Sequence, residues 1–326
     1  MHLFMKRIFQ NKLLNAILKI LILSGLLYVL YRQLFGNEKM EIAYKHFMLN
    51  FHGNYFLLFC VIFLMMINWS IEAIKWKLLI DKLHPISWLD AIEGILFGVT
   101  FSLFTPSRIG EFGGRVFALD TDRKEAIVST ILGSLAQIVV NLSLGALGLL
   151  FYILYFEKID TYLTFAFIFI YVLMVLAIHF CFYNLDVVST KFSHFPFLKK
   201  VYKYLHIIDL YSYKDFLWLE ILSGLRYLVY CLQFVLLLKF FGFQLTFSSA
   251  MILVSAIFFV QTINPFNIAL IDFGFRGNVA AYFLAAFTVN PITIIAATIT
   301  LWVINLIIPA IIGGIAALRF RFFKEE

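Results

Sequence analysis

Residues 105–115, with the sequence TPSRIGEFGGR, combine side chains that could do chemistry with residues that interrupt a helix. Arg108, Glu111 and Arg115 are ionisable, and a guanidinium group grips phosphate or carboxylate at two points. Glycine-rich backbone with free N–H groups can add an anion-binding concavity. Because a charge inside hydrocarbon costs several kcal/mol, we expect this stretch to bind an anion. The alternative is an interfacial Arg–Glu pair that ends a helix.

Broken backbone is the second property of this stretch. At membrane depth it is tolerated only where protein or a water-filled cavity satisfies the freed polar groups. We predict helix breaks or hinges at two places, one in each half of the chain. The residues expected to form them are Pro106, Gly110, Gly113 and Gly114 in the first place, and Pro265 and Gly274 in the second.

Two further sets of ionisable residues lie in apolar surroundings. Asp272 and Arg276 are four positions apart, so they share one helical face and can pair as part of a binding site or as a loop salt bridge. Arg226 lies deep in an apolar run, where an ionisable group is a functional candidate. Glu220 is six positions away and points elsewhere, so we expect Arg226 to neutralise Glu111 or to face the same cavity.

The composition indicates an integral membrane protein. Hydrophobic residues make up 63% of the 326 residues and charged residues only 14%, whereas a soluble domain has about 25% charged residues. The net charge of +7 comes mainly from basic residues in the loops between apolar segments. This distribution favours contact with anionic lipid headgroups over binding to nucleic acid. A charged shoulder after the second apolar run and the start of the third are predicted to mark the cytoplasmic boundary: Glu72, Lys75, Lys77, Asp90 and Glu93.

The pattern of apolar runs predicts an all-α polytopic membrane protein with a single integral membrane domain, residues 1–326. We expect six full spans and two broken, re-entrant hairpins. The spans are 13–31, 54–71, 126–156, 162–182, 216–241 and 292–318, and the hairpins are 88–115 and 248–289. Most lysines and arginines then fall on one face, which places both termini in the cytoplasm and the protein in the cell (inner) membrane.

The two halves of this layout have the same order of segments. The offset from Pro106 to Pro265 also superposes the flanking spans approximately, so residues 12–156 and 161–320 form a predicted repeat. Three full crossings in each half would make the second half inverted relative to the first. Paired interrupted segments of this kind indicate the substrate site of a transporter.

The motifs resemble those of a known family, the flippase-like transmembrane domain of lysylphosphatidylglycerol synthases. Residues 105–115 are similar to that family's T-P-G-x-x-G-E…R, and Pro265…Gly274-Phe275-Arg276 is similar to its P…G-x-R-E. The likeness covers about residues 12–320. The sequence departs from the pattern at Ser107, where glycine is commoner, and at Gly277, where an acidic residue is usual; Asp272 is a substitute for that missing carboxylate.

The resemblance implies that the protein moves a phospholipid or a polyprenyl-phosphate lipid between leaflets. Arg108 and Arg115 would bind the phosphate, and a separate lipid-modifying enzyme or glycosyltransferase is a possible partner. The sequence has no metal-ligand spacing, no Walker loop and no G-x-G-x-x-G, so we expect no cofactor and no enzymatic activity. Two alternatives stay open, a membrane enzyme that modifies a lipid-phosphate headgroup with Glu111 or Asp272 as general base, and a non-transporting scaffold.

Overall fold

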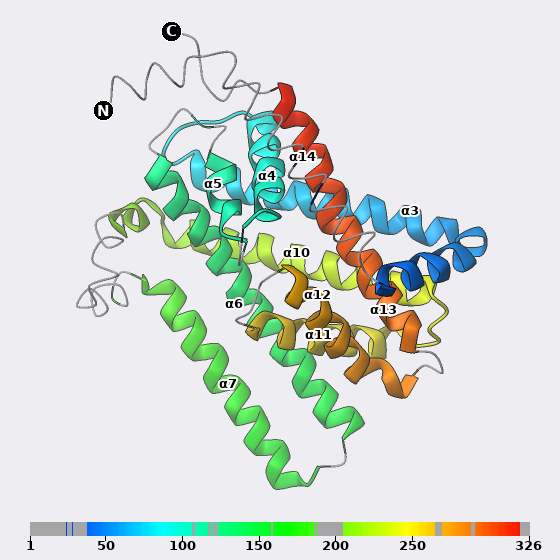
Figure 1. Cartoon of the computed structure of the whole chain (residues 1–326). Helices are drawn as coiled ribbons and strands as arrows, with labels where there is room; N and C mark the ends of the chain where they lie inside the picture. Colours follow the sequence, from blue (N-terminus) through cyan, green and yellow to red (C-terminus); the bar gives the residue numbers. More distant parts are fainter. Residues whose placement is uncertain are drawn as a thin grey trace.

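The computed structural model describes residues 24, 28, 38–105, 108–116, 119, 123–157, 159–185, 187, 205–264, 269–287 and 291–319. Every regular element within these ranges is helical (Figure 1). The elements are α3 (Glu38–Ile80), α4 (Trp88–Ser102), α5 (Gly110–Val116), α6 (Arg123–Phe156), α7 (Thr161–Tyr183), η2 (Leu205–Leu210), α10 (Tyr213–Phe240), α11 (Phe247–Ile263), α12 (Ala269–Leu284), η3 (Ala285–Phe287), α13 (Pro291–Trp302), η4 (Val303–Ile307) and α14 (Ile308–Arg319).

Five helical segments are long and apolar enough to cross a membrane. They are Gly53–Ile80, Lys124–Phe156, Thr161–Tyr183, Tyr213–Phe240 and Thr293–Ala317. These segments coincide with five of the six predicted full spans. The remaining span, 13–31, falls outside the described residues apart from Ser24 and Tyr28. The prediction of an all-α polytopic membrane protein is confirmed.

The centre of the protein is the long contact between α3 and α10. Helix α3 bends at Asn54 (φ −135°, ψ 23°), and the side-chain amide of Asn54 donates to the carbonyl of Phe240, 3.4 Å away. Further along, the buried Gln233 donates to the carbonyl of Val61 across 2.9 Å. A carbonyl at the end of a helix and a polar side chain inside apolar helices both need such partners, and these bonds fix the register of the two spans.

The first predicted hairpin contains two helices, α4 and α5, joined by residues 103–109. Ser87 and Asp90 form a capping box at the start of α4: the Asp90 carboxylate accepts from the backbone N–H of Ser87, and the Ser87 hydroxyl accepts from that of Asp90. Helix α4 packs against α14, and the hydroxyl of Thr100 donates to the carbonyl of Ala310 across 2.9 Å. The hairpin is therefore held from the far end of the chain.

The second predicted hairpin contains α11 and α12, and α11 packs along α6. The contacts between helices recur when the two halves are exchanged. The corresponding helices α3 and α10 pack on each other. Helix α4 packs on α14 in the same way as α11 packs on α6, and α3 packs on α13 in the same way as α10 packs on α6. Two halves of similar build would make this pattern, although the inverted repeat itself stays a prediction.

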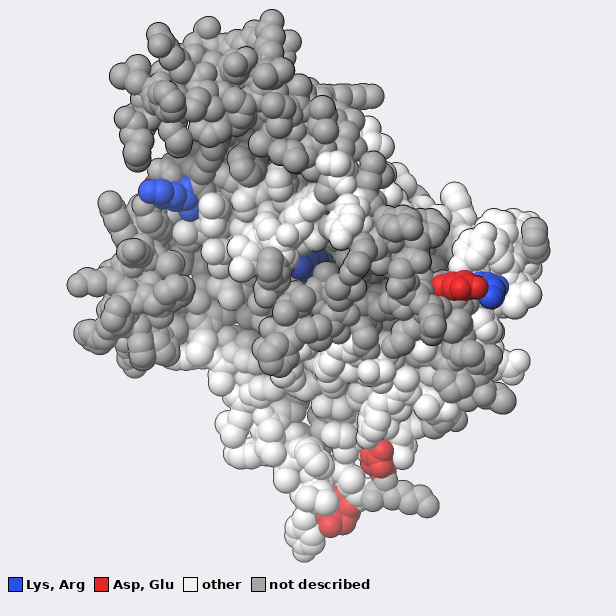
Figure 2. All heavy atoms as spheres, viewed as in Figure 1, with Lys and Arg blue, Asp and Glu red and all other residues white. Residues whose placement is uncertain are grey.

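The outer surface is strongly apolar, as a bilayer requires. On the face in Figure 2 the charged side chains of the described residues are few and lie mostly at the periphery, with one basic group near the middle. Helix α7 contacts mainly α6, and only 6% of its span is buried (Figure 1). Its large hydrophobic side chains therefore face lipid.

Candidate functional site

The turn between α4 and α5 presents Arg108. The hydroxyl of Thr105 accepts a hydrogen bond from the backbone N–H of Gly110, 2.7 Å away, and so caps the first residue of α5. Arg108 has a backbone φ of 58°, a left-handed conformation that is uncommon for residues other than glycine. Such strain persists only where the surroundings impose it, and it concentrates at functional sites. Pro106 and Ser107 lie outside the described residues.

Close packing of α4 on α5 depends on small residues. A Cβ atom built on Gly114 would lie 2.8 Å from the carbonyl oxygen of Phe97 and 2.9 Å from the Cα of Gly98. On Gly98, a Cβ would meet the side chain of Arg115 at 2.6 Å. The two helices therefore approach at these glycines, and the approach carries Arg115 into the interior, where its side chain is only 3% exposed.

The hinge predictions for Gly113 and Gly114 are wrong, because both residues lie inside α5. Gly110 is the first residue of that helix, so the break precedes it. Gly114 is required for close packing, whereas a Cβ on Gly113 would meet nothing within 4 Å. Gly114 therefore allows α4 and α5 to approach closely, and neither Gly113 nor Gly114 is a hinge.

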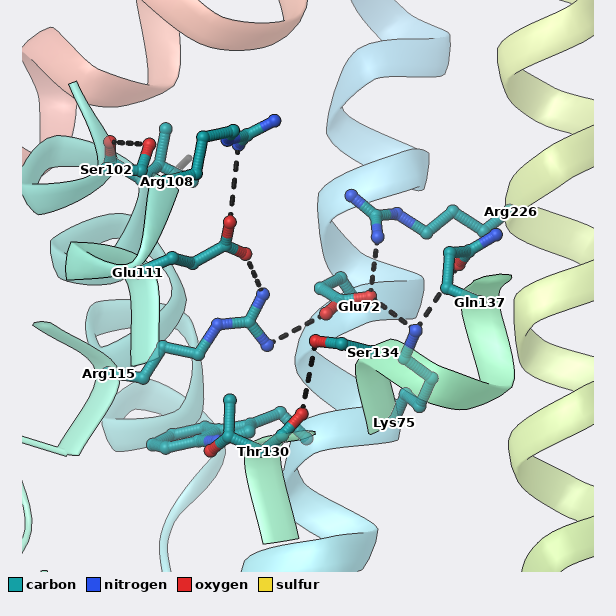
Figure 3. A network of polar contacts seen from close by, with 12 residues as sticks. Glu72, Lys75, Ser102, Arg108, Glu111, Arg115, Thr130, Ser134, Gln137 and Arg226 are labelled. Carbon is teal, nitrogen blue, oxygen red and sulfur yellow. Dashed lines mark hydrogen bonds and ion pairs between the residues drawn. The ribbon is translucent and has the colours of Figure 1, made fainter. Parts of the chain in front are cut away.

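A continuous network of ion pairs begins at Arg108 (Figure 3). Its Nη2 lies 3.4 Å from Oε2 of Glu111, and the other oxygen of Glu111 pairs with Arg115. Arg115 also pairs with Oε1 of Glu72 at 2.8 Å. The second oxygen of Glu72 lies 2.8 Å from both Lys75 and Arg226. Glu72 is thus shared by three cations from α3, α5 and α10.

Neutral groups complete the network at its α10 end. Lys75 donates to Gln137 at 3.3 Å and to the hydroxyl of Ser223 at 3.4 Å. Arg226 donates from Nε to Asn68 at 2.9 Å, and its guanidinium carbon lies 5.1 Å from the centre of the Trp69 ring. The aromatic face and the amide hold the Arg226 guanidinium in place, because both favour a cation.

Exposure is graded along the network. Glu72, Lys75 and Arg115 are at most 3% exposed, whereas Arg226 and Glu111 are each 20% exposed and Arg108 is 39% exposed. The network contains four basic and two acidic side chains, and therefore has a formal charge of +2. A buried cluster with excess positive charge is under-compensated, and an anion is the ligand that would balance it.

A comparison with known protein families shows to which family the chain is related. The model of the lysylphosphatidylglycerol synthase TM region matches residues 16–313. The chain belongs to this family. The finding confirms the resemblance seen in the motifs, and it covers nearly the whole described structure. No curated protein and no solved structure matches the chain.

In this member of the lysylphosphatidylglycerol synthase TM family, the predicted site residues of the first half come together with Arg226 of the second half. Arg108, Glu111, Arg115 and Arg226 all belong to the network. Arg226 pairs directly with Glu72 and is connected to Glu111 only through Glu72 and Arg115. Of the two expectations for Arg226, neutralising Glu111 or facing the same cavity, the first is therefore wrong. Among the described side chains, no group of three or more His, Cys, Asp and Glu residues could hold a metal ion.

The boundary interpretation of Glu72 and Lys75 is wrong, because both are buried at the centre of the network. The sequence contains a signal that could have identified them. An acid and a base at i and i+3 pair on a helix, and the residues after them, Trp76 to Ile80, are still mostly apolar. The helix thus continues beyond the pair, to Ile80.

The second hairpin contributes differently from the expectation. Gly274 and Arg276 lie inside the continuous helix α12, so the predicted break at Gly274 is wrong and the interruption lies before Ala269. Pro265 and the side chain of Asp272 fall outside the described residues. Arg276 is half-buried. The Asp272–Arg276 pairing stays a prediction.

Proposed function

We propose that this protein moves a lipid with an anionic phosphate headgroup between the leaflets of the cell membrane, with both termini in the cytoplasm. The observation that carries the proposal is the network, buried at its centre and partly exposed at Arg108, with a formal charge of +2. Arg226 lies in the middle of the span Tyr213–Phe240, roughly 20 Å from its start at 1.5 Å per residue. A phosphate is the natural counterion for such a group, since acyl chains stay in the bilayer while the headgroup crosses.

Arg108 and Arg226 are the two cations best placed to bind the headgroup. Arg108 makes one ion pair, at 3.4 Å, and is the most exposed member of the network. Arg226 uses Nε and Nη1 for Asn68 and Glu72, and its Nη2 has no hydrogen-bond partner in the described part of the chain. Each arginine can therefore donate a hydrogen bond to a phosphate oxygen without losing an existing bond.

Arg115 acts in another way. Both of its terminal nitrogens already pair with carboxylates, and its side chain is 3% exposed. We assign it the role of a clamp that holds Glu72 and Glu111, and thereby sets the positions of the other two arginines. This assignment replaces the initial expectation that Arg115 touches the phosphate.

The geometry of Glu111 supports transport without chemistry. A general base needs a carboxylate oxygen free to accept the substrate's proton. Each oxygen of Glu111 is paired with an arginine, Arg115 for one and Arg108 for the other, and this stabilises the ionised form and makes the carboxylate a weaker base. The recurring helix contacts of the two halves add support, because paired interrupted hairpins are typical of transporters.

The test is lipid movement in proteoliposomes that contain the purified full chain. The probes are headgroup-labelled phosphatidylglycerol and a polyprenyl phosphate, with phosphatidylcholine as a lipid without net charge. We expect wild type to move at least one anionic probe. Arg108→Ala and Arg226→Gln each remove a charge-assisted bond, and should slow this movement about tenfold or more.

The matched control is Lys45→Ala, which removes a cation from an exposed surface pair with Glu41. It should leave the rate unchanged. Equal movement of phosphatidylcholine by wild type, or full activity of both arginine variants, would contradict the proposal. Conversion of either anionic probe into a new product, abolished by Glu111→Gln, would establish the enzyme alternative.

A further inference from the structure

A second cluster of ionisable groups lies where the end of α7 meets α10. Glu220 of α10 accepts a hydrogen bond from the Tyr183 hydroxyl at Oε2, 2.7 Å away. Its other oxygen, Oε1, lies 3.5 Å from Nε2 of His179. Oε1 is buried and has no hydrogen-bond partner among the described residues. None of these residues pairs with the ion network described above.

The position of the His179 ring determines which of its two nitrogens carries a hydrogen. Nδ1 of His179 lies 2.9 Å from the carbonyl oxygen of Val175. A carbonyl oxygen only accepts, so Nδ1 must carry a hydrogen. In neutral histidine the other nitrogen, Nε2, then has a lone pair, and this lone pair would face the carboxylate oxygen of Glu220. Two acceptors facing each other repel, and one added proton between them turns the contact into a bond.

The side chains around His179 and Glu220 do not compete with this pair for a proton. Tyr213 stacks on Tyr183 with ring centres 4.9 Å apart, and it offers no charge at neutral pH. On the segment that leads into α10, the Tyr211 hydroxyl is engaged by the Leu79 carbonyl and the Ser129 hydroxyl.

The charged groups near Glu220 on α10 and on the neighbouring α3 have other partners. Asp215 caps Ser212 and pairs with Lys82, which lies beyond the end of α3. Lys75 of α3 is directed to Glu72 and Ser223. His179 lies one turn before the end of α7 at Tyr183 and is 32% exposed, and Glu220 is 15% exposed.

We propose that His179 and Glu220 form a proton-binding site that is coupled to headgroup binding at the ion network. The proton comes from the adjacent aqueous phase, binds to Nε2 and is shared with Oε1, and it returns to water when released. This inference rests on the proposed function for its coupling step. It makes the proton a second ligand, whose binding from the adjacent aqueous phase changes the rate of that function.

Helix α10 is the physical connection between the two sites. Glu220 precedes Arg226 by six residues, about 9 Å along the helix at 1.5 Å per residue. Ser223 lies between them and contacts Lys75 of the network with its hydroxyl. Loading the pair changes the net charge beside this helix turn by one unit, and in low-dielectric surroundings a charge acts over such a distance. Proton and phosphate therefore favour each other's binding.

The first experiment observes the proton directly. The full chain, labelled with ¹⁵N-histidine and reconstituted in nanodiscs, is titrated by NMR, and His179→Gln identifies the signal of interest. We expect the Nδ1 hydrogen to persist throughout, and the Nε2 signal to titrate at a different pH in Glu220→Gln than in wild type. The exposed His84 is an internal reference that should titrate alike in all samples. Identical titration of His179 with and without Glu220 would overturn the proton site.

The second experiment measures coupling. Transport of the anionic probe is followed with an imposed pH gradient and without one. The gradient should change the wild-type rate by about fivefold or more, the lower range of coupling between sites. His179→Gln and Glu220→Gln should abolish this response while retaining movement without a gradient. Tyr183→Phe, which removes only the bond to Oε2, should keep the response.

The two experiments separate the possible failures. If wild type moves no lipid, the proposed function fails, while the NMR titration still decides the proton site. A rate that responds equally to the gradient in all variants would overturn the coupling.

Discussion

Replacing Glu72 by glutamine tests the electrostatic reasoning most directly. The carboxylate lies 2.8 Å from Arg115, Lys75 and Arg226, and the first two of these cations are almost fully buried. Glutamine keeps the shape but removes the charge, so three cations lose their common partner. Breaking one buried ion pair by removing one partner costs about 3–5 kcal/mol. We expect a loss of folding free energy of at least about 3 kcal/mol, the lower end of this range.

The assay is reversible unfolding in mixed micelles with increasing SDS, with helicity as the signal. Glu93→Gln is the control, because this exposed carboxylate of α4 should matter by no more than about 0.5 kcal/mol. The double variant Glu72→Gln/Lys75→Gln removes one acid and one base, and the network keeps its formal charge. Its loss should be smaller than the sum of the single losses by about 0.5–3 kcal/mol. A single variant no less stable than Glu93→Gln would refute the buried network.

Three further predictions use the same unfolding assay. Gly114→Ala should destabilise the α4–α5 contact by about 1–3 kcal/mol, because the added Cβ meets backbone at 2.8 Å, whereas Gly113→Ala has free space and should be neutral or slightly stabilising. Tyr211→Phe removes a buried hydroxyl bonded to a carbonyl and to Ser129, and should cost about 1–3 kcal/mol. Thr105→Val removes the cap of α5 and should cost about 1 kcal/mol, while Thr105→Ser retains it.

The architecture was largely predictable because its signals are local. A run of apolar residues is its own evidence for a span, and the five described spans fall where hydropathy placed them. The first cluster of the site was predictable for the same reason. Arg108, Glu111 and Arg115 stand within eight positions. A spacing of four residues places Glu111 and Arg115 on one face of α5, and Arg108 lies in the turn just before this helix.

The rest of the site depends on contacts that no local pattern records. Glu72 and Lys75 stand at the end of an apolar run, where a buried pair and a membrane boundary have the same local appearance. Their burial is decided by Arg115, Gln137 and Ser223, which come from other helices and lie far along the chain. A glycine in a sequence is also ambiguous, because it can mark either a helix break or a close helix–helix contact. Gly114 allows close packing, although its sequence context predicted an interruption.

The arrangement of charges also suits the order in which the chain enters the membrane. Glu72 and Lys75 pair within α3, and Glu111 and Arg115 pair within α5, so each of these segments supplies its own counterion. Arg226 relies on Glu72, which precedes it by 154 residues. Synthesis proceeds from the N-terminus, so the acid is already in the bilayer when the base arrives. Helix α10 therefore inserts next to a carboxylate that is already in place, and the cation whose counterion lies on another helix is the last of the network to be added.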